Sequence, residues 1–192
     1  MSKDRLNVNF KTKFLAFMTV VLLLFFTGCY QENSTPALSP DIYRLEDYEN
    51  NEVFDIEKVS LDKKLAQKSI TYKFSYLSDG YEIKAYVSIP VFAVESRKPQ
   101  KCLMFNRGGN AAIGGLSDTT TASISAECNR IVIASQYRGG GSDGVDEFGG
   151  DDINDVIKLI DLCQNHFKFI DMEDFCVAGV SRGGMMTYMA AR

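Results

Sequence analysis

Residues 175–184 read FCVAGVSRGG, and this stretch decides the fold that the chain is expected to adopt. Four apolar residues run into Gly-x-Ser-x-Gly, and a helix-forming run follows directly. This order of strand, tight turn and helix is the context of a nucleophile elbow, which holds a serine hydroxyl clear of the sheet. A Cβ at Gly179 or Gly183 would crowd the neighbouring strand or helix, and the lack of one at Gly184 would let the helix pack closely. The pattern therefore predicts Ser181 as a nucleophile.

The residue after the serine is the second part of this prediction. The backbone N–H of Arg182 would stand at the start of the helix and point to where a tetrahedral oxyanion forms. Another interpretation stays open, in which the segment is a glycine-rich connection between strand and helix and the serine is incidental.

Length and composition are those of an ordinary globular protein with one domain. The chain has 192 residues, of which 45% are hydrophobic and 24% charged, with a net charge of −4. There is no basic excess that would indicate a nucleic-acid partner, and no acidic tail. We therefore expect no nucleic-acid partner.

The N-terminus has the features of an export signal. Four basic residues, Lys3, Arg5, Lys11 and Lys13, precede an apolar run over residues 14–26. The run is shorter than the ~20 residues of a transmembrane helix and fits the hydrophobic region of a secretory signal. The sequence Thr27-Gly28-Cys29 then resembles a bacterial lipobox, which implies cleavage after residue 28 and lipidation of Cys29. A plain signal peptide or an uncleaved anchor are the alternatives.

The residues after the signal divide into three segments. Because Tyr30 and not aspartate follows Cys29, the sorting pattern of lipoproteins favours the outer membrane of the cell envelope over the inner. Residues 29–40 are polar with two prolines and predict a tether. Residues 41–68 are charged and weakly periodic, and we expect an irregular flank of unassigned role. Residues 69–192 hold the predicted domain.

Within this domain, periodicity predicts strands that alternate with helices after an N-terminal hairpin. Two runs that alternate between apolar and polar residues flank Asp79-Gly80, which is typical of a hairpin turn. Downstream, the pattern predicts strands over residues 101–105 and 131–134, helices over residues 119–129 and 151–167, and a glycine-rich loop over residues 136–150. We therefore expect an α/β fold with an open, mostly parallel sheet.

Four cysteines follow Cys29, in a chain whose expected export permits disulfides. Cys102 and Cys176 open apolar strands, and Cys163 lies on the apolar stripe of a helix. We expect these three to be buried as small hydrophobic side chains. Neither Cys-x-x-Cys nor a Cys/His spacing occurs, so a zinc site is not expected.

Five segments together resemble one known family. In chain order they are Ser78-Asp79-Gly80 with its hairpin, residues 105–110 (FNRGGN), residues 137–144 (YRGGGSDG), residues 148–152 (FGGDD) and the elbow. They are similar to the front half of an α/β-hydrolase catalytic domain, and within that fold to the prolyl oligopeptidase family. The resemblance implies a serine hydrolase that cleaves peptide or ester bonds and uses no metal or organic cofactor.

The resemblance also implies a second oxyanion donor at Gly108 and Gly109. In α/β-hydrolases a backbone N–H on the loop after the third strand faces the elbow. Related oligopeptidases often have tyrosine or histidine where this chain has Arg107, so either a backbone N–H or a side chain could supply the donor. The alternative is that the two glycines only form a tight turn.

The glycine-rich loop contains Gly-x-Gly-x-x-Gly at Gly139, Gly141 and Gly144, which by itself would suggest a dinucleotide-binding oxidoreductase. In that fold a helix opens inside the motif, whereas the helical periodicity of this chain starts near residue 151. We therefore expect a structural loop, with Arg138 anchored to an acidic residue such as Asp152 or Asp155.

The general base is missing from this sequence. After Ser181, residues 182–192 contain no Asp, Glu or His, and the one histidine of the chain is His166. That residue ends the helix leading into the far end of the elbow strand, roughly 15 Å or more from Ser181 at ~3.3 Å per strand residue. We therefore expect an incomplete catalytic domain, inactive by itself, from a longer enzyme. The second hypothesis is a non-catalytic lipoprotein that retains the elbow as a relic.

Overall fold

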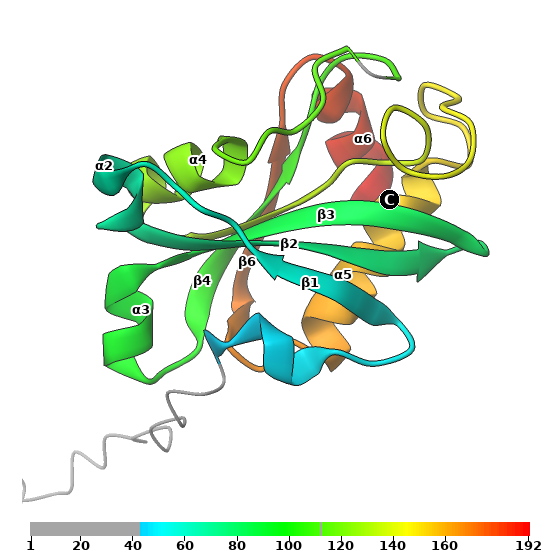
Figure 1. The fold of residues 1–192 in the computed structure, drawn as a ribbon. Coiled ribbons are helices and arrows are strands. Elements are labelled where there is room, and N and C mark those ends of the chain that lie inside the picture. Colours follow the sequence, from blue (N-terminus) through cyan, green and yellow to red (C-terminus); the bar gives the residue numbers. More distant parts are fainter. Residues whose placement is uncertain (1–42, 112) are drawn as a thin grey trace, which may run out of the picture. The chain divides into compact units, whose positions relative to one another are not determined.

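The computed structural model describes residues 43–111 and 113–192, all within one unit of the chain, residues 36–192 (Figure 1). The predicted signal peptide, Cys29 and the predicted tether lie outside the described residues. In chain order the elements are η2 (Leu45–Tyr48), β1 (Val53–Lys58), α2 (Lys63–Ala66), β2 (Ser69–Ser78), β3 (Tyr81–Pro90), α3 (Val91–Ser96), β4 (Gln100–Asn106), α4 (Thr120–Cys128), β5 (Ile131–Ser135), α5 (Ile153–Asn165), β6 (Ile170–Gly179) and α6 (Arg182–Ala190).

The sheet is mixed, with strand order β1-β2-β3-β5-β4-β6. Strands β1, β2, β3 and β5 pair antiparallel, whereas β4 is parallel to both β5 and β6. The alternation of strands and helices is as expected, but the antiparallel share is larger than a mostly parallel sheet implies. The parallel part is confined to β4, β5 and β6, the three strands that helices connect, and the elbow follows β6.

The segment that we expected to be an irregular flank contributes a strand. Within residues 41–68, β1 pairs with β2 along the edge of the sheet. The register shifts between Phe54 and Glu57, and Asp55 has a positive φ of 51°. A bulge of this kind interrupts the two-residue alternation, which is why the sequence pattern did not indicate a strand.

The predicted hairpin and its Asp-Gly turn are present. Ser78 pairs with Tyr81, so the loop between β2 and β3 has two residues, Asp79 and Gly80. Their φ angles are 52° and 81°. Positive φ at both central positions defines a type I′ turn, whose twist matches that of the flanking strands.

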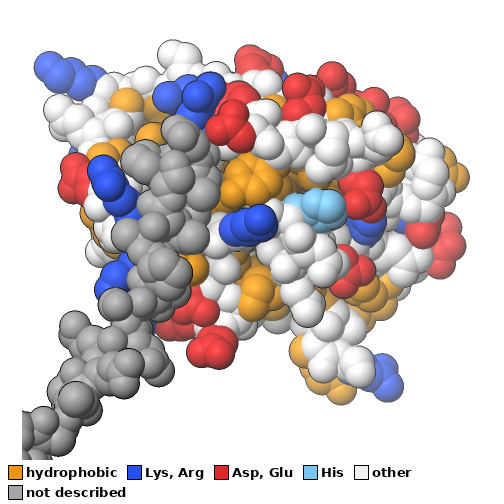
Figure 2. Space-filling model, turned by 90° about the horizontal axis from the view of Figure 1, so that it is seen from below, with side chains coloured by type: hydrophobic (Ala, Val, Ile, Leu, Met, Phe, Trp, Pro, Cys, Tyr) orange, Lys and Arg blue, Asp and Glu red, His pale blue; other side chains and the backbone are white. Residues whose placement is uncertain are grey.

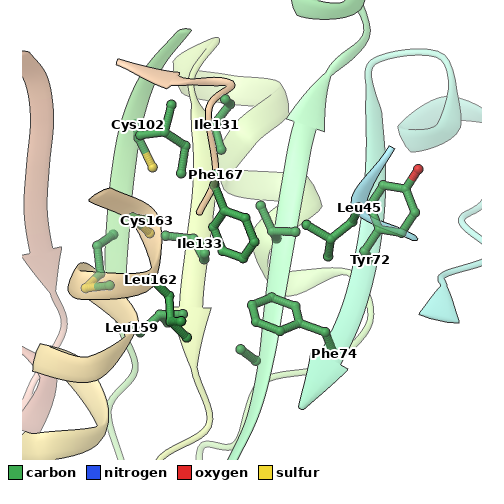
Figure 3. Packing of buried hydrophobic residues seen from close by; sticks show 14 of the residues in the cluster. Leu45, Tyr72, Phe74, Cys102, Ile131, Ile133, Leu159, Leu162, Cys163 and Phe167 are labelled. Atoms are coloured by element: carbon green, nitrogen blue, oxygen red, sulfur yellow. The ribbon is translucent and has the colours of Figure 1, made fainter. Parts of the chain in front are cut away.

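The main hydrophobic core lies between the sheet and α5. Helix α5 buries its apolar stripe, Val156, Leu159, Leu162 and Cys163, against the inner face of the strands. Figure 3 shows Leu159, Leu162 and Cys163 pointing toward Ile133 of β5, with Phe74 of β2 and Phe167 beside them. Truncation of such a residue, for example Leu159→Ala, costs about 2–5 kcal/mol because a cavity remains. This packing fixes the strands whose carboxyl ends carry the site.

The expectation for the cysteines is correct at two positions and wrong at one. Cys102 and Cys163 are buried, but Cys176 is exposed, as is Cys128. Strand β6 lies at an edge of the described sheet, and α4 packs over β2, β3 and β5. The side of β6 that carries Cys176 therefore has no helix over it among the described residues. All four of these cysteines are free.

Apolar side chains are also exposed next to the elbow. Val180, Met185 and Tyr188 have exposed fractions of 61%, 37% and 68%. Together with the edge position of β6, they leave an apolar sheet edge and helix face exposed among the described residues. Among the helices of the described residues, none has the length and apolarity needed to cross a membrane.

Candidate active site

Ser181 occupies the turn between β6 and α6. It is exposed, and its backbone has φ 55° and ψ −121°, a conformation that non-glycine residues rarely adopt. Its hydroxyl has no hydrogen-bond partner within residues 43–111 and 113–192. Backbone strain of this kind persists only where the surrounding structure enforces it, and it concentrates at functional positions. The strand, turn and helix predicted around the serine are all present.

Two of the three glycines around the serine are required by close packing. A Cβ on Gly179 would lie 2.2 Å from the carbonyl oxygen of Gly183, and a Cβ on Gly183 would lie 1.9 Å from that of Asn106. These distances are below any real contact, so the two glycines let α6 approach β4 and β6 as predicted. Gly184 is different, because its Cβ would meet nothing closer than 3.9 Å. The prediction that this third glycine serves close packing is wrong, because a Cβ there would meet only the carbonyl oxygen of Gly179 at an ordinary contact distance.

The loop after β4 lies beside Ser181. A Cβ on Gly108 would be 3.4 Å from the Cβ of Ser181 and 3.0 Å from the carbonyl oxygen of Val180. Gly109 has φ 79°, and a Cβ there would collide with the carbonyl of Ile113 at 1.8 Å. Within the described part of the chain, the backbone N–H groups of Gly108, Gly109 and Arg182 have no acceptor. Gly108 thus lies beside the serine, and N–H groups without an acceptor among the described residues occur on both segments where donors were expected.

Arg107 does not direct its side chain at the serine. The side chain is buried, with 1% of the residue exposed, and it stacks on the ring of Tyr137 at 4.8 Å. Its guanidinium donates to the carbonyl oxygens of Gln136, Gly108 and Ala111, at 2.8, 3.0 and 3.3 Å. Burial lowers the pKa of this group below its usual value. Because the side chain is bound within the loops, the backbone is the candidate donor on this side of the site.

The side chain of Arg182 lies behind the elbow. It is fully buried and forms ion pairs with Asp146, at 2.6 Å, and with Asp152. It also donates to the carbonyl of Gly109 at 3.3 Å, while the rings of Tyr137 and Phe148 lie about the guanidinium at 5.1 and 5.0 Å. These ion pairs join residues 36 and 30 positions apart in the chain, and no local sequence pattern indicates them.

Asp146 joins the elbow to the loop that carries the glycines. One carboxylate oxygen accepts hydrogen bonds from Arg182 and from the backbone N–H of Ala111, and the other accepts from the N–H of Phe148. Burial alone would raise the pKa of Asp146, but these three hydrogen bonds hold it below the usual value of a carboxyl group. The carboxylate therefore stays charged and fixes the distance between the two loops.

Residues 117–192 match the sequence profile of the Prolyl oligopeptidase family. The structure is similar to a hyperthermophilic esterase from the archaeon Pyrobaculum calidifontis, with a TM-score of 0.53 and 17% identity over 67% of this chain and 40% of that one. It is also similar to an acetyl xylan esterase from Paenibacillus sp. R4, with a TM-score of 0.53 and 18% identity over 79% of this chain and 52% of that one. The chain has the α/β-hydrolase fold.

A third similar structure is an ester hydrolase from the metagenome of Lake Arreo, with a TM-score of 0.50 and 17% identity over 91% of this chain and 52% of that one. The chain thus spans about half, or less, of the length of these hydrolase-fold proteins. No curated protein sequence matches it.

In this hydrolase fold, Arg138 anchors the glycine-rich loop. Its guanidinium binds Asp155 at 2.7 Å and Asp79 at 2.8 Å, and Asn154 also donates to Asp79. Asp155 is one of the two partners that the sequence suggested for Arg138. The other, Asp152, pairs with Arg182 and not with Arg138. The loop therefore connects to the hairpin turn through one arginine and to the elbow through the other.

The glycine motif of this loop is not followed by a helix as a dinucleotide fingerprint requires. After Gly139, Gly141 and Gly144 the chain continues in turns until α5 begins at Ile153. Within the described residues, no group of three or more His, Cys, Asp or Glu side chains could hold a metal ion.

His166 lies at the end of α5 remote from the elbow, as expected. Its Nε2 is 3.0 Å from a carboxylate oxygen of Glu52, which also binds Lys158 at 2.6 Å. Figure 2 views the molecule from below and shows the histidine on that surface beside acidic side chains, whereas α6 lies in the upper part of Figure 1. His166 is therefore part of a surface charge cluster and has no contact with Ser181.

Proposed function

We propose that the protein is a serine hydrolase of the prolyl oligopeptidase-like group, which cleaves peptide or ester bonds through an acyl-enzyme on Ser181. The observation that carries the proposal is the conformation of Ser181 itself. Its strained backbone holds an exposed hydroxyl at the carboxyl end of β6, between two glycines that permit no side chain, and beside unpaired N–H groups. Strain and unpaired polar groups both require an explanation, and nucleophilic catalysis explains both.

The proposed chemistry assigns a role to each group. The Oγ of Ser181 attacks the substrate carbonyl, and its proton passes to a general base. The carbonyl oxygen then carries the negative charge of the tetrahedral intermediate. The N–H of Arg182 donates to it from one side and the N–H of Gly108 or Gly109 from the other, an arrangement that is generally worth about 10²–10³-fold in kcat per donor. Collapse of the intermediate expels the amine or alcohol and leaves the acyl-enzyme.

The proposal requires a base other than His166. That side chain is engaged by Glu52, and no other histidine occurs in residues 1–192. The mechanism therefore needs an imidazole, held by an acid, from outside these residues. An enzyme without these two groups retains only about 10³–10⁴-fold catalysis over water.

The family match and the similar structures indicate different substrate classes. The matched family is one of peptidases, whereas the three similar structures described above are two esterases and an ester hydrolase. Both reactions use the same tetrahedral intermediate, so the elbow serves either. We therefore propose acyl transfer to water as the reaction. Rates measured with matched amide and ester substrates distinguish a peptidase from an esterase.

For location, we propose export and anchoring to the bacterial envelope through lipid on Cys29, in the outer membrane in preference to the inner. The support is the order of basic residues, apolar run and Thr27-Gly28-Cys29 in the sequence. A single acyl chain binds membranes only marginally, and stable anchoring takes more than one. Metabolic labelling with a palmitate analogue should mark the wild type and miss Cys29→Ser. Equal labelling of both would refute the lipid anchor.

The decisive test of the activity is covalent labelling of the serine. The intact protein here means the chain together with the proposed base from outside residues 1–192. In it a fluorophosphonate should label Ser181, and Ser181→Ala should lose both the label and hydrolysis of p-nitrophenyl esters. Residues 29–192 expressed alone should do neither, because they contain no base for this serine. An intact, folded protein that leaves Ser181 unlabelled would instead support a non-catalytic lipoprotein with a relic elbow. Stoichiometric labelling of residues 29–192 would show that an unidentified base reaches the serine.

A further inference from the structure

Arg107 is a buried cation without a carboxylate partner. Within the described residues it forms no ion pair, whereas Arg138 and Arg182, the two other buried arginines, each bridge two aspartates. Burial of an unpaired charge is costly, and in general such charges are paired or placed where they serve a purpose. Three carbonyl oxygens and the face of Tyr137 contact this guanidinium directly, and the nearby charge of Asp146 adds a weaker attraction.

One of these carbonyls belongs to the peptide group beside the serine. The Nη1 of Arg107 donates to the oxygen of Gly108 at 3.0 Å. The same peptide group carries the N–H of Gly109, which has no acceptor within the described residues. Gly108 itself lies against Ser181, since a Cβ on it would come within 3.4 Å of the serine Cβ. A positive charge is therefore hydrogen-bonded to the oxygen end of a peptide group whose N–H end has no acceptor among the described residues, and this peptide group begins at the residue that lies against Ser181.

The remaining contacts hold the guanidinium in place. Its Nε donates to Gln136 directly after β5, and its Nη2 donates to Ala111 farther along the glycine loop. Tyr137, whose ring faces the guanidinium, donates its hydroxyl to the backbone oxygen of Arg107 at 3.3 Å. Arg107 thus connects the carboxyl ends of β4 and β5 and fixes the conformation of the loop between residues 107 and 111.

We propose that Arg107 is a positioning residue for the oxyanion site: it orients and polarises the Gly108–Gly109 peptide so that the N–H of Gly109 binds the oxyanion formed at Ser181. The inference rests on the proposed function. A hydrogen bond to the carbonyl of a peptide strengthens its N–H as a donor, and the effect grows where water is excluded. A fixed charge close to a developing oxyanion stabilises it without reorganisation during the reaction. This gives a role to the residue that stands where related oligopeptidases often have tyrosine or histidine.

The test measures the oxyanion directly. In the intact protein, an aryl trifluoromethyl ketone should form a hemiketal in which Ser181 Oγ bonds to the carbonyl carbon and the serine proton passes to the base. The pKa of the hemiketal hydroxyl is then read from the ¹⁹F chemical shift as a function of pH. In Arg107→Gln that pKa should rise by about one unit, a tenfold loss of oxyanion stabilisation. The kcat for ester hydrolysis should fall about 10- to 100-fold with KM nearly unchanged, less than the largest losses seen when a donor is removed outright.

Arg107→Lys separates charge from geometry. Lysine keeps the positive charge, but one ammonium group cannot reach the carbonyls of Gly108, Ala111 and Gln136 together. The hemiketal pKa should therefore rise by a smaller amount than in Arg107→Gln. If Arg107→Gln does not fold, as judged by circular dichroism, the lysine variant decides the question by the same measurement.

Arg138→Gln and Arg138→Lys are the matched controls. They alter an equally buried arginine that binds Asp155 and Asp79 and no peptide beside the serine. These variants should lose thermal stability but leave the hemiketal pKa unchanged. If Arg107 variants bind the ketone less tightly with an unchanged hemiketal pKa, the role of Arg107 is structural only and the inference fails while the proposed function stands. If the wild type forms no adduct at Ser181, the proposed function fails and the inference with it.

Discussion

Two charge clusters in this molecule have the same composition but differ in the burial of their aspartates and in the hydrogen bonding of their arginines. The hairpin cluster consists of Arg138, Asp155 and Asp79, and the elbow cluster of Arg182, Asp146 and Asp152. Each has a buried arginine between two aspartates. In the hairpin cluster, the Nε and Nη2 of the arginine bind Asp155 as a fork, and Nη2 also binds Asp79, which is 45% exposed. In the elbow cluster the side chains of both aspartates are buried, and the Nε of the arginine has no partner within the described part of the chain.

Unpartnered polar atoms gather at the elbow and not at the hairpin cluster's arginine. Within the described residues, three buried side-chain atoms lack a hydrogen bond: Ser78 Oγ, Asn106 Oδ1 and Arg182 Nε. Asn106 ends β4, and its carbonyl accepts from Val180 next to the serine. Two of the three atoms therefore lie around the elbow, together with the free N–H groups. Buried polar groups are nearly always satisfied, so the arginine of the hairpin cluster is bonded more completely than the arginine of the elbow cluster, although Ser78 beside Asp79 also has an unpartnered oxygen.

The largest expected effect comes from removing each arginine. Arg182→Met would leave Asp146 and Asp152 buried without a counter-ion, whereas Arg138→Met would do so only to Asp155. Breaking a buried ion pair costs about 3–5 kcal/mol, and we expect Arg182→Met to reach that range and to exceed Arg138→Met. Urea denaturation of the two variants of the intact protein measures the difference. The comparison fails if Arg138→Met is the more destabilised.

The next effect distinguishes two adjacent glycines of α6. In Gly183→Ala the new Cβ would overlap the carbonyl of Asn106, so α6 must shift, at a cost of about 1–3 kcal/mol for overpacking. In Gly184→Ala the new Cβ has room, and alanine favours a helix interior over glycine by about 1 kcal/mol. Thermal unfolding should therefore show a lower midpoint for the first variant and an equal or higher one for the second. Equal destabilisation by both would contradict the packing of α6 against β4.

The pH dependence of stability should come more from the elbow cluster than from the hairpin cluster. Hydrogen bonds from Arg182, Ala111 and Phe148 outweigh burial and lower the pKa of Asp146, and those from Arg138 and Asn154 lower the pKa of Asp79. A carboxyl group whose pKa is lower in the folded state stabilises the protein above its unfolded pKa, and the stabilisation is lost as the pH falls through the folded value.

For the exposed Asp79 that contribution should stay below about 1 kcal/mol, because solvent screens the pair. The measurement is the free energy of unfolding between about pH 7 and pH 3, the range in which carboxyl groups titrate. Asp79→Asn should leave the slope of stability with pH nearly as in the wild type, whereas Asp146→Asn should reduce it. A larger change of slope in Asp79→Asn would reverse the assignment.

The smallest effect concerns reactivity and not stability. Cys102 and Cys163 lie in the core, where burial raises the pKa of both thiols, while Cys128 and Cys176 are exposed. A maleimide should therefore label Cys128 and Cys176 of native residues 30–192 and reach Cys102 and Cys163 only after denaturation. The same labelling of the intact protein sharpens the comparison, because protection of Cys176 there would mean that this side of β6 is covered.

The sequence by itself determined the elements whose signals are local. The two-residue alternation and Asp79-Gly80 predicted the hairpin, the helical spacing predicted α5 within a few residues, and the glycines around Ser181 predicted the elbow. Each of these signals arises from residues close together in the chain, so a short window contains all the information.

Only the tertiary structure decided which charges meet. Asp146 and Asp152 are 36 and 30 residues from Arg182 in the chain, and no periodicity connects them. The structure likewise placed β1 at the edge of the sheet, exposed Cys176 and bound the side chain of Arg107 to three backbone carbonyls. Patterns of apolar residues indicate which side chains face the core. The partner that a buried charge finds there depends on how distant loops converge at the carboxyl ends of the strands, and that is set by the packing of the whole domain.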